Sequence, residues 1–214
     1  RNKKRFGESL GVSVVLKKFD QDIGEAVLIK QVEQISQDKN VHGIIVQLPL
    51  PEGIDSTRVI NSIPKNKDAD GLNSVSELGS ANIITPATAR AVESIFDYYE
   101  IPVAHKKIAV IGRSRLAGGP IAESLTRRGA EVSVCHKGTE NTQEVCLSSD
   151  IIISAAGQAG LIGRDFVKEG QVVIDVGINK VERGEKDSLE PKPKLVGDVN
   201  FDEVAPIVEA ITPV

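Results

Sequence analysis

The stretch Lys107-Ile-Ala-Val-Ile-Gly-Arg-Ser-Arg-Leu-Ala-Gly-Gly-Pro120 runs from a short apolar segment into glycines, and a segment of helical period follows it. This order of strand, glycine turn and helix is typical of a loop that binds the phosphates of a dinucleotide. Gly112 allows a sharp turn, and Gly118 allows the backbone to approach a ligand closely. Unpaired N–H groups at a helix start attract phosphate. The stretch predicts a nucleotide site, with a purely structural tight turn as the alternative.

The spacing departs from G-x-G-x-x-G, because Arg113 and Ser114 follow Gly112 directly. The next predicted strand ends in Val134-Cys-His-Lys-Gly-Thr139, where an NAD-specific site usually places a carboxylate that holds the ribose 2′-OH. No carboxylate stands in this stretch, and Arg113 and Lys137 are able to pair with a 2′-phosphate. The pattern favours NADP over NAD; the alternative is two solvated basic residues. We expect His136 to pack or to form hydrogen bonds here rather than to act as a catalyst.

Two further strand ends carry small residues, Ala155-Ala-Gly157 and Asp175-Val-Gly-Ile-Asn179. Ligands of an open parallel sheet gather at the carboxyl ends of its strands, so these exits are expected to face the same ligand. The predicted cofactor-binding residues are Gly112, Arg113, Ser114, Gly118, His136, Lys137, Gly157, Gly177 and Ile178.

Short runs rich in Val and Ile alternate along the chain with longer segments of helical period, which indicates repeated βαβ units and an α/β fold with a mostly parallel sheet. The runs lie at residues 12–16, 43–46, 108–111, 132–134, 151–153 and 172–174.

Two helices are predicted outside the glycine loop. Asp22-Ile-Gly-Glu25 resembles a capping box, and Leu28, Val32 and Ile35 follow it at helical spacing. A second helix is expected over residues 86–99, with Ala89, Val92 and Phe96 facing inward. The polar residues 183–194 are predicted to form a solvated hairpin or loop.

The stretch Val41-His-Gly-Ile-Ile-Val-Gln-Leu-Pro-Leu-Pro51 starts as an apolar strand and ends in prolines. Proline has no N–H for a sheet ladder, so Pro49 and Pro51 are expected to mark the place where the chain leaves a sheet. Gln47 then lies at the end of this strand.

Composition excludes some classes of protein. The 214 residues are 26% charged with a formal net charge of -4, and no basic block offers the surface that nucleic-acid binding requires. No apolar run approaches the roughly 20 residues of a membrane span. Cys135 and Cys146 are predicted to be buried, reduced thiols of a cytosol-like compartment. The chain starts at Arg1 and contains no methionine, so we expect it to lack its native start.

Several stretches together resemble the bifunctional methylenetetrahydrofolate dehydrogenase/methenyltetrahydrofolate cyclohydrolase family over essentially the whole chain. They are Val46-Gln-Leu-Pro-Leu-Pro51, Lys67-Asp-Ala-Asp-Gly71, Pro86-Ala-Thr88, Gly112-Arg-Ser114 with Gly118 and Pro120, Asp175-Val-Gly-Ile-Asn179, Val196-Gly-Asp-Val199 and Ile211-Thr-Pro-Val214.

The resemblance implies an α/β protein with two lobes flanking a cleft, the second a Rossmann-type dinucleotide-binding domain. It implies a folate-binding catalytic domain at residues 1–88, an NADP-binding domain at 89–205, and the start of a return to the first domain at 206–214. The implied function is NADP-dependent oxidation of 5,10-methylenetetrahydrofolate, followed by hydrolysis of the methenyl product to 10-formyltetrahydrofolate, by a cytoplasmic homodimer.

The resemblance also assigns residues to the folate site. Arg1-Asn-Lys3 matches the end of the family's Tyr-x-x-x-Lys motif, which makes Lys3 the candidate catalytic lysine, with Lys4 as the alternative. Gln47 is implied to contact Lys3 and folate, and Asp70 to accept hydrogen bonds from the pterin. The residues alone leave Asp70 as a turn residue, with Asp68 equally suited to that part. The implied substrate-binding set is Lys3, Val46, Gln47, Leu48, Asp70 and Pro213.

The chain also departs from the family pattern. It ends at Val214, where family members continue with a glycine-rich segment, and Ala89, Ala91 and Ala117 replace residues of two motifs. Two alternatives therefore stay open: a two-domain NADP dehydrogenase with another small substrate, and a chain that binds nucleotide or folate without turnover.

Overall fold

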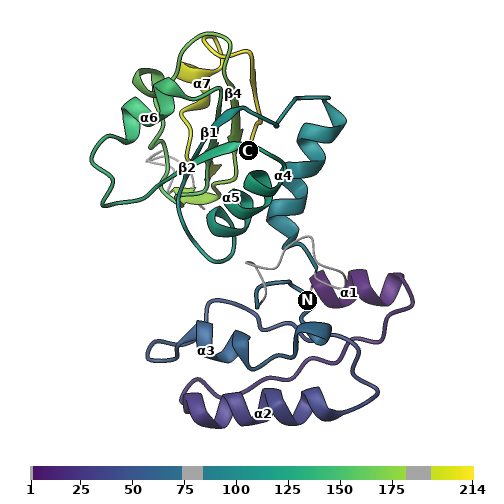
Figure 1. The fold of residues 1–214 in the computed structure, drawn as a ribbon. Coiled ribbons are helices and arrows are strands. Elements are labelled where there is room, and N and C mark those ends of the chain that lie inside the picture. The colour runs from purple at the N-terminus through teal and green to yellow at the C-terminus, as the bar shows by residue number, and fades with distance from the viewer. Residues whose placement is uncertain (1, 74–83, 182–193) are drawn as a thin grey trace, which may run out of the picture. The chain divides into compact units, whose positions relative to one another are not determined.

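The computed structural model describes residues 2–73, 84–181 and 194–214 (Figure 1). The chain divides into two compact units, Arg1–Lys67 and Asp68–Val214. Each unit has its own apolar core, and each is described by itself below.

The second unit is built on a five-stranded sheet in the order β2-β1-β3-β4-β7, and every neighbouring pair is parallel. The four strands predicted for this unit are confirmed, whereas the short strand β7 was not predicted. The strands are β1 (Lys107–Ile111), β2 (Glu131–Cys135), β3 (Ile151–Ser154), β4 (Val172–Asp175) and β7 (Ala210–Ile211).

Helices cover both faces of this sheet, and alternate strand residues supply two apolar layers. Ile108, Val110 and Ile153 pack beneath α4 and α5, whereas Ala109 and Ile152 face the α6 and α7 side (Figure 1). Burying each large aliphatic side chain stabilises the unit by roughly 1.5–3 kcal/mol. The helices are α4 (Ala87–Tyr98), α5 (Gly118–Arg127), α6 (Thr142–Ser148), η3 (Arg164–Phe166) and α7 (Phe201–Val204).

The predicted helix at residues 86–99 is confirmed as α4, and its expected inward residues Ala89, Val92 and Phe96 are buried. A second, antiparallel sheet pairs β5 (Asn179–Val181) with β6 (Lys194–Val196). The hairpin or loop predicted at residues 183–194 lies outside the described residues, except for Lys194 at the start of β6.

The two cysteines are free and fully buried, as predicted. Burial raises the pKa of both thiols, that of Cys146 to about 12. Because the thiolate is the reactive form, we expect neither thiol to react with a disulfide reagent in the folded protein at pH 8, and both to react after unfolding. Thiol titration with and without denaturant checks this, and rapid labelling of the folded protein would contradict the buried positions.

The first unit consists of α1 (Asn2–Ser9), α2 (Glu25–Gln37), α3 (Ser56–Asn61), the short helix η1 (Lys65–Lys67) and irregular connections. Leu28 and Val32 of α2 pack against Val59 of α3, and Ile44 and Val46 of the irregular segment join them. The Lys67 ammonium donates to the Ser36 and Asp38 carbonyls at 2.7 and 2.8 Å, which anchors the chain at the end of α2.

Two strand predictions in this unit are wrong. Residues 12–16 are in no strand, with Val15 76% exposed, and residues 43–46 form a single bridge in which Ile44 N–H donates to the Lys67 carbonyl at 2.7 Å. Val and Ile favour strands, but a strand also needs a partner, and within the described residues neither stretch forms a ladder. Pro49 and Pro51 therefore do not end a sheet strand.

The predicted capping box is also wrong. The N-cap of α2 is Gly24, and no side chain caps the helix. Glu25 instead points to another segment, since its carboxylate accepts a hydrogen bond from Asp55 N–H at 2.7 Å and pairs with Arg58 at 2.5 Å. A tertiary contact thus replaces the local bond that the spacing suggested.

Within the described part of the chain, no helix has the length and apolar character needed to cross a membrane.

Candidate functional site

The carboxyl ends of the central strands meet at one edge of the parallel sheet. In the register, Ile111 of β1 lies opposite both Cys135 of β2 and Ser154 of β3, and Ser154 lies opposite Asp175 of β4. The chain proceeds from β1 to β2 on one side and then crosses to β3 on the other, so the order reverses between β1 and β3. This is the switch point at which open parallel sheets bind their ligands.

The loop after β1 requires glycine at two positions. Gly112 has a φ of 108°, and its N–H donates to the Cys135 carbonyl at 2.8 Å. A Cβ at Gly112 would collide with the Ala155 carbonyl, and one at Gly118 would collide with the Gly112 carbonyl. Side chains larger than hydrogen would therefore open the turn from β1 to α5.

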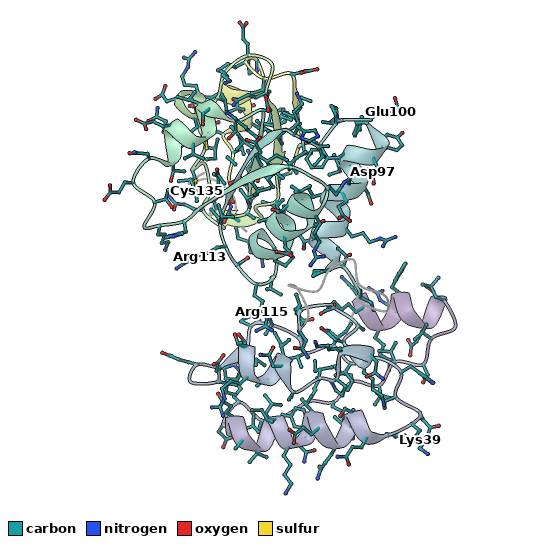
Figure 2. All side chains as sticks on the ribbon, viewed as in Figure 1. Lys39, Asp97, Glu100, Arg113, Arg115 and Cys135 are labelled. Carbon is teal, nitrogen blue, oxygen red and sulfur yellow. The ribbon has the colours of Figure 1, made fainter. Side chains whose placement is uncertain are left out.

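The start of α5 suits a phosphate. Its N-cap, Ala117, provides no side-chain hydrogen bond; Gly119 N–H donates to the Ser114 carbonyl at 2.9 Å, and Pro120 has no N–H. Arg113 and Ser114 are exposed on the preceding loop, and Figure 2 labels Arg113 together with Cys135 of the adjacent strand end. The positive end of the α5 dipole and the Arg113 guanidinium suit an anionic dinucleotide.

In the turn after β2, His136 forms hydrogen bonds, which is the role that the sequence predicted for it. Its N–H donates to Thr139 Oγ1 at 3.0 Å, and its Nδ1 accepts a hydrogen bond from Gly138 N–H at 3.1 Å. These bonds shape a tight turn with Lys137 exposed upon it. The turn thus presents an ammonium at the carboxyl edge.

Two carboxylates meet at this edge: Asp175, partly buried at the end of β4, and Asp198, fully buried in the connection before α7. Burial raises the pKa of Asp175, although hydrogen bonds from the Val199, Asp198 and Gly177 backbones lower it. The predicted residues Gly157 and Gly177 lie in these exits, and Ile178 is 72% exposed. The sequence prediction gave Asp198 no role; its place in Val196-Gly-Asp-Val199, one of the stretches that carry the family resemblance, was the available signal.

All nine predicted cofactor residues thus lie in the second unit, eight in loops at the strand ends and Gly118 at the start of α5. The structure brings these segments to one edge of one sheet. The residues present fit a dinucleotide with an anionic 2′ group.

The predicted folate residues of the first unit lie on two segments. Lys3 is exposed on α1, while the neighbouring Lys4 pairs with Glu8 at 3.6 Å. Gln47 is exposed and its side-chain amide donates to the Leu48 carbonyl at 2.9 Å. Val46 packs into the core of the unit, whereas the adjacent Gln47 is exposed.

The other two predicted folate residues, Asp70 and Pro213, belong to the second unit. Asp68 is buried, and its carboxylate accepts from Gly71 N–H at 3.0 Å and Asn73 N–H at 2.7 Å. Asp68 therefore shapes the turn, whereas Asp70 is only partly buried and Pro213 is exposed.

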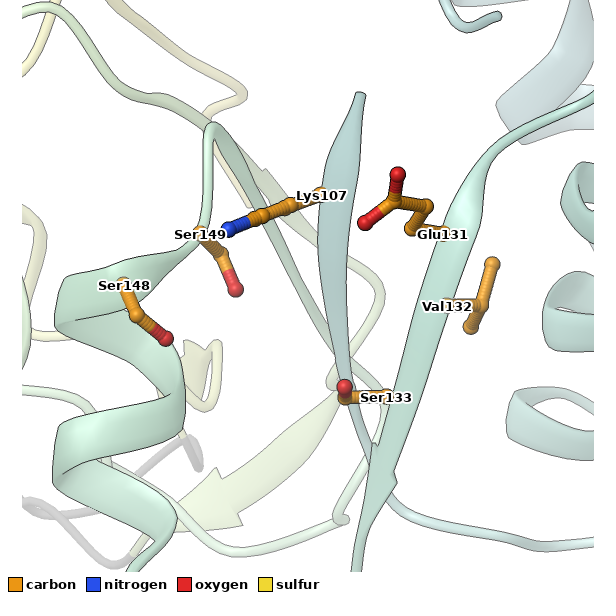
Figure 3. Close-up of a pocket in the computed structure, with 6 residues that line it drawn as sticks. All are labelled: Lys107, Glu131, Val132, Ser133, Ser148 and Ser149. Carbon is orange, nitrogen blue, oxygen red and sulfur yellow. The ribbon is translucent and has the colours of Figure 1, made fainter. Parts of the chain in front are cut away.

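A pocket of about 340 Å³ lies at the opposite, amino-terminal edge of the sheet (Figure 3). Lys107 and Glu131, the first residues of β1 and β2, stand at its walls. The Ser148 and Ser149 hydroxyls there already donate to the Val145 carbonyl, at 3.0 and 2.7 Å. The pocket is thus separate from the strand ends that carry the predicted site.

The whole chain matches one family. A model of the tetrahydrofolate dehydrogenase/cyclohydrolase NAD(P)-binding domain matches residues 86–214, and one of the catalytic domain of that family matches residues 1–70. The bifunctional protein FolD 2 of Lactobacillus johnsonii is 40% identical over 218 residues, which cover 100% of this chain and 73% of the relative. FolD of Methanoculleus marisnigri is 39% identical over 217 residues, covering 100% and 74%.

Solved structures agree. The bifunctional FolD methylenetetrahydrofolate dehydrogenase/cyclohydrolase of Campylobacter jejuni superposes with a TM-score of 0.88 at 36% identity, covering 100% of this chain and 74% of that one. The Trypanosoma brucei FolD, solved with NADP cofactor and an inhibitor, gives a TM-score of 0.85 at 31% identity, covering 99% and 73%. The chain belongs to the bifunctional methylenetetrahydrofolate dehydrogenase/cyclohydrolase family.

Proposed function

We propose that the chain oxidises 5,10-methylenetetrahydrofolate with NADP and then hydrolyses the methenyl product to 10-formyltetrahydrofolate. Membership of the family supports both reactions in one-carbon folate metabolism. The choice of NADP rests on one observation. At the carboxyl edge of the sheet, the start of α5 lies among loops that carry Arg113 and Lys137.

In the first reaction, NADP accepts the hydride of the methylene carbon when it is bound. Loss of hydride leaves a cation shared by two folate nitrogens, so the protein needs no strong base and its main contribution is positioning. The backbones at Gly112 and Gly118 admit the dinucleotide, and Gly177 and Ile178 lie where the chain leaves β4. The position of these backbones sets the distance between donor carbon and cofactor.

In the second reaction, a protein group must accept a proton from the attacking water. We assign this part to Lys3, the lysine that matches the family's motif, as the proton acceptor. The Gln47 amide orients the lysine through a carbonyl that accepts and an N–H that donates, without holding the proton as a carboxylate would. Asp70 accepts hydrogen bonds from the pterin, and Val46, Leu48 and Pro213 supply apolar contact to folate.

Lys137 sets the preference for NADP in this proposal. We expect Lys137→Ala to raise the KM for NADP about fivefold, since the ammonium pairs with the 2′-phosphate at an exposed position, and to leave the KM for NAD unchanged. Steady-state kinetics with both cofactors measures the difference.

Lys107→Ala is the matched control, because Lys107 is an exposed lysine at the amino-terminal edge of the same sheet. It should change neither KM. An equal effect of Lys137→Ala on the KM for NADP and the KM for NAD would contradict the contact assigned between Lys137 and the 2′-phosphate.

The proposal also includes the domain boundaries, the oligomeric state and the cellular compartment. Residues 1–88 bind folate, residues 89–205 bind NADP, and residues 206–214 begin the return to the first domain. The chain acts as a homodimer in the cytoplasm, a reducing compartment that suits the free thiols of Cys135 and Cys146.

Separate assays of the two half-reactions test the function. The purified protein is given 5,10-methylenetetrahydrofolate with NADP or NAD, and methenyltetrahydrofolate alone, and reduced cofactor and methenyl absorbance are followed. We expect NADP to be preferred and the methenyl compound to be consumed without cofactor. Absence of both reactions would favour the alternative in which the chain binds its ligands without turnover.

A further inference from the structure

Asp198 is a fully buried carboxylate in the short connection between β6 and α7. Its side chain lies against the exits of two central strands, and the motifs used to predict the site assigned it no part. A buried carboxylate needs hydrogen-bond donors to offset its lost hydration, so its partners show what it holds in place.

The two oxygens of Asp198 accept five hydrogen bonds, all from residues at or just after the carboxyl ends of β3 and β4. Three consecutive backbone N–H groups after β3 point at it, together with one hydroxyl from the end of β3 and one amide from the start of β5. The donors are Ser154 Oγ (3.1 Å), Ala156 N (2.7 Å) and Gly157 N (3.0 Å) to Oδ2, and Gln158 N (2.8 Å) and Asn179 Nδ2 (2.9 Å) to Oδ1.

A second carboxylate fixes Asp198 itself. Asp175, the last residue of β4, accepts from Asp198 N–H at 3.0 Å and Val199 N–H at 2.9 Å. A Cβ at Gly197 would collide with the Asp175 carboxylate, and one at Gly177 would collide with that of Asp198. The two carboxylates therefore link the exits of β3 and β4 to the connection before α7, with no room for another side chain.

We propose that Asp198 is a positioning residue for the dinucleotide, which holds the backbone after β3 and, through Asn179, the backbone after β4 in the shape that receives the cofactor. The inference rests on the proposed NADP site, because Gly157, Gly177 and Ile178 belong to that site. Asp198 touches neither substrate nor cofactor in this account, and it acts through the loops that it holds.

The arrangement requires a carboxylate rather than a neutral amide. Every hydrogen bond that the Asp198 carboxylate accepts comes from an N–H group, except that of the Ser154 hydroxyl, which is able to reverse its bond. In an asparagine, the NH₂ group would face N–H donors in either orientation. At least one N–H group after β3 or on Asn179 would then lose its acceptor, and the buried amide NH₂ would face donors that it cannot satisfy.

The test is Asp198→Asn, with binding of NADP measured by calorimetry and hydrolysis of methenyltetrahydrofolate measured without cofactor. We expect NADP to bind at least about tenfold more weakly, because the loops after β3 and β4 lose the acceptor that holds them, while the hydrolysis rate stays within about twofold. A merely structural effect would lower both together. Asp202→Asn is the matched control, since Asp202 is exposed in the first turn of α7, and it should change neither.

Unchanged NADP binding by folded Asp198→Asn would overturn the inference, and so would an equal loss of binding and hydrolysis. If that variant does not fold, Ser154→Ala is the test instead, because it removes only one of the five donors to Asp198. We expect Ser154→Ala to weaken NADP binding about two- to fivefold. Unchanged binding by this variant would overturn the inference. Failure of the unmutated protein to bind NADP would instead overturn the proposed function, which keeps the two failures distinct.

Discussion

Lys3→Ala is expected to lower the rate of methenyltetrahydrofolate hydrolysis by about 10²- to 10⁴-fold, the usual contribution of a positioned general base. The dehydrogenase rate with NADP should fall much less, because loss of hydride to the cofactor needs no protein base. The ratio of the two rates, measured on one preparation, checks the prediction.

Lys4→Ala is the control for the Lys3 variant. Lys4 is the next residue on the same helix and pairs with Glu8 at the surface, so its removal should leave both rates nearly unchanged. Should Lys4→Ala abolish hydrolysis and Lys3→Ala leave it intact, the alignment with the family's lysine motif is shifted by one residue. If neither variant matters, the base is another group.

Gly118→Ala is expected to weaken NADP binding by about 10- to 100-fold, the range for forcing a methyl group into a packed site. The added Cβ would meet the backbone of Gly112, so the turn from β1 to α5 would have to open. Hydrolysis of methenyltetrahydrofolate uses no cofactor and should persist. Calorimetry with NADP, together with the hydrolysis rate, measures both effects.

Two further glycines serve as controls for that variant. Gly119→Ala should have an intermediate effect, because its Cβ would lie 3.2 Å from the Ser114 carbonyl oxygen. Gly24→Ala should have none, since Gly24 has a φ of -70° and nothing lies within 4 Å of the added atom. Equal NADP binding by all three variants would show that the loop tolerates a side chain and is not a close-approach site.

The cofactor side of the protein was predictable because its determinants are local. Buried parallel strands are nearly continuous Val and Ile runs, so β1, β3 and β4 were visible in the sequence. Gly112 marked the turn because only glycine adopts its φ of 108° easily. Parallel pairing then places the strand ends at one edge, whatever the lengths of the helices between them.

The features that were missed depend on distant partners. Residues 12–16 and 43–46 have strand composition, yet pairing is decided by a neighbour that composition does not reveal. The strand β7 has only two residues and is defined by its pairing with Val172 and Val173. Asp198 had no assigned role in the sequence, because the donors that it accepts from lie 19 to 44 residues away in the chain.

The folate side rests on the resemblance more than on local pattern. Gln47 was predicted to stand at the end of a sheet strand, but it is exposed on an irregular segment next to Val46, which packs into the core of the first unit. Asp68 and Asp70 were equivalent as turn residues in the sequence. The hydrogen bonds that Asp68 accepts from Gly71 and Asn73 assign the turn to Asp68.

The most direct measurement of the central claim is a single reaction that contains the protein, 5,10-methylenetetrahydrofolate and NADP. Reduced cofactor and folate products are quantified together over time. The account predicts that NADPH and the sum of methenyl- and 10-formyltetrahydrofolate rise in equal amounts, with the formyl product coming after the methenyl one. No NADPH in a preparation that binds both ligands would contradict it.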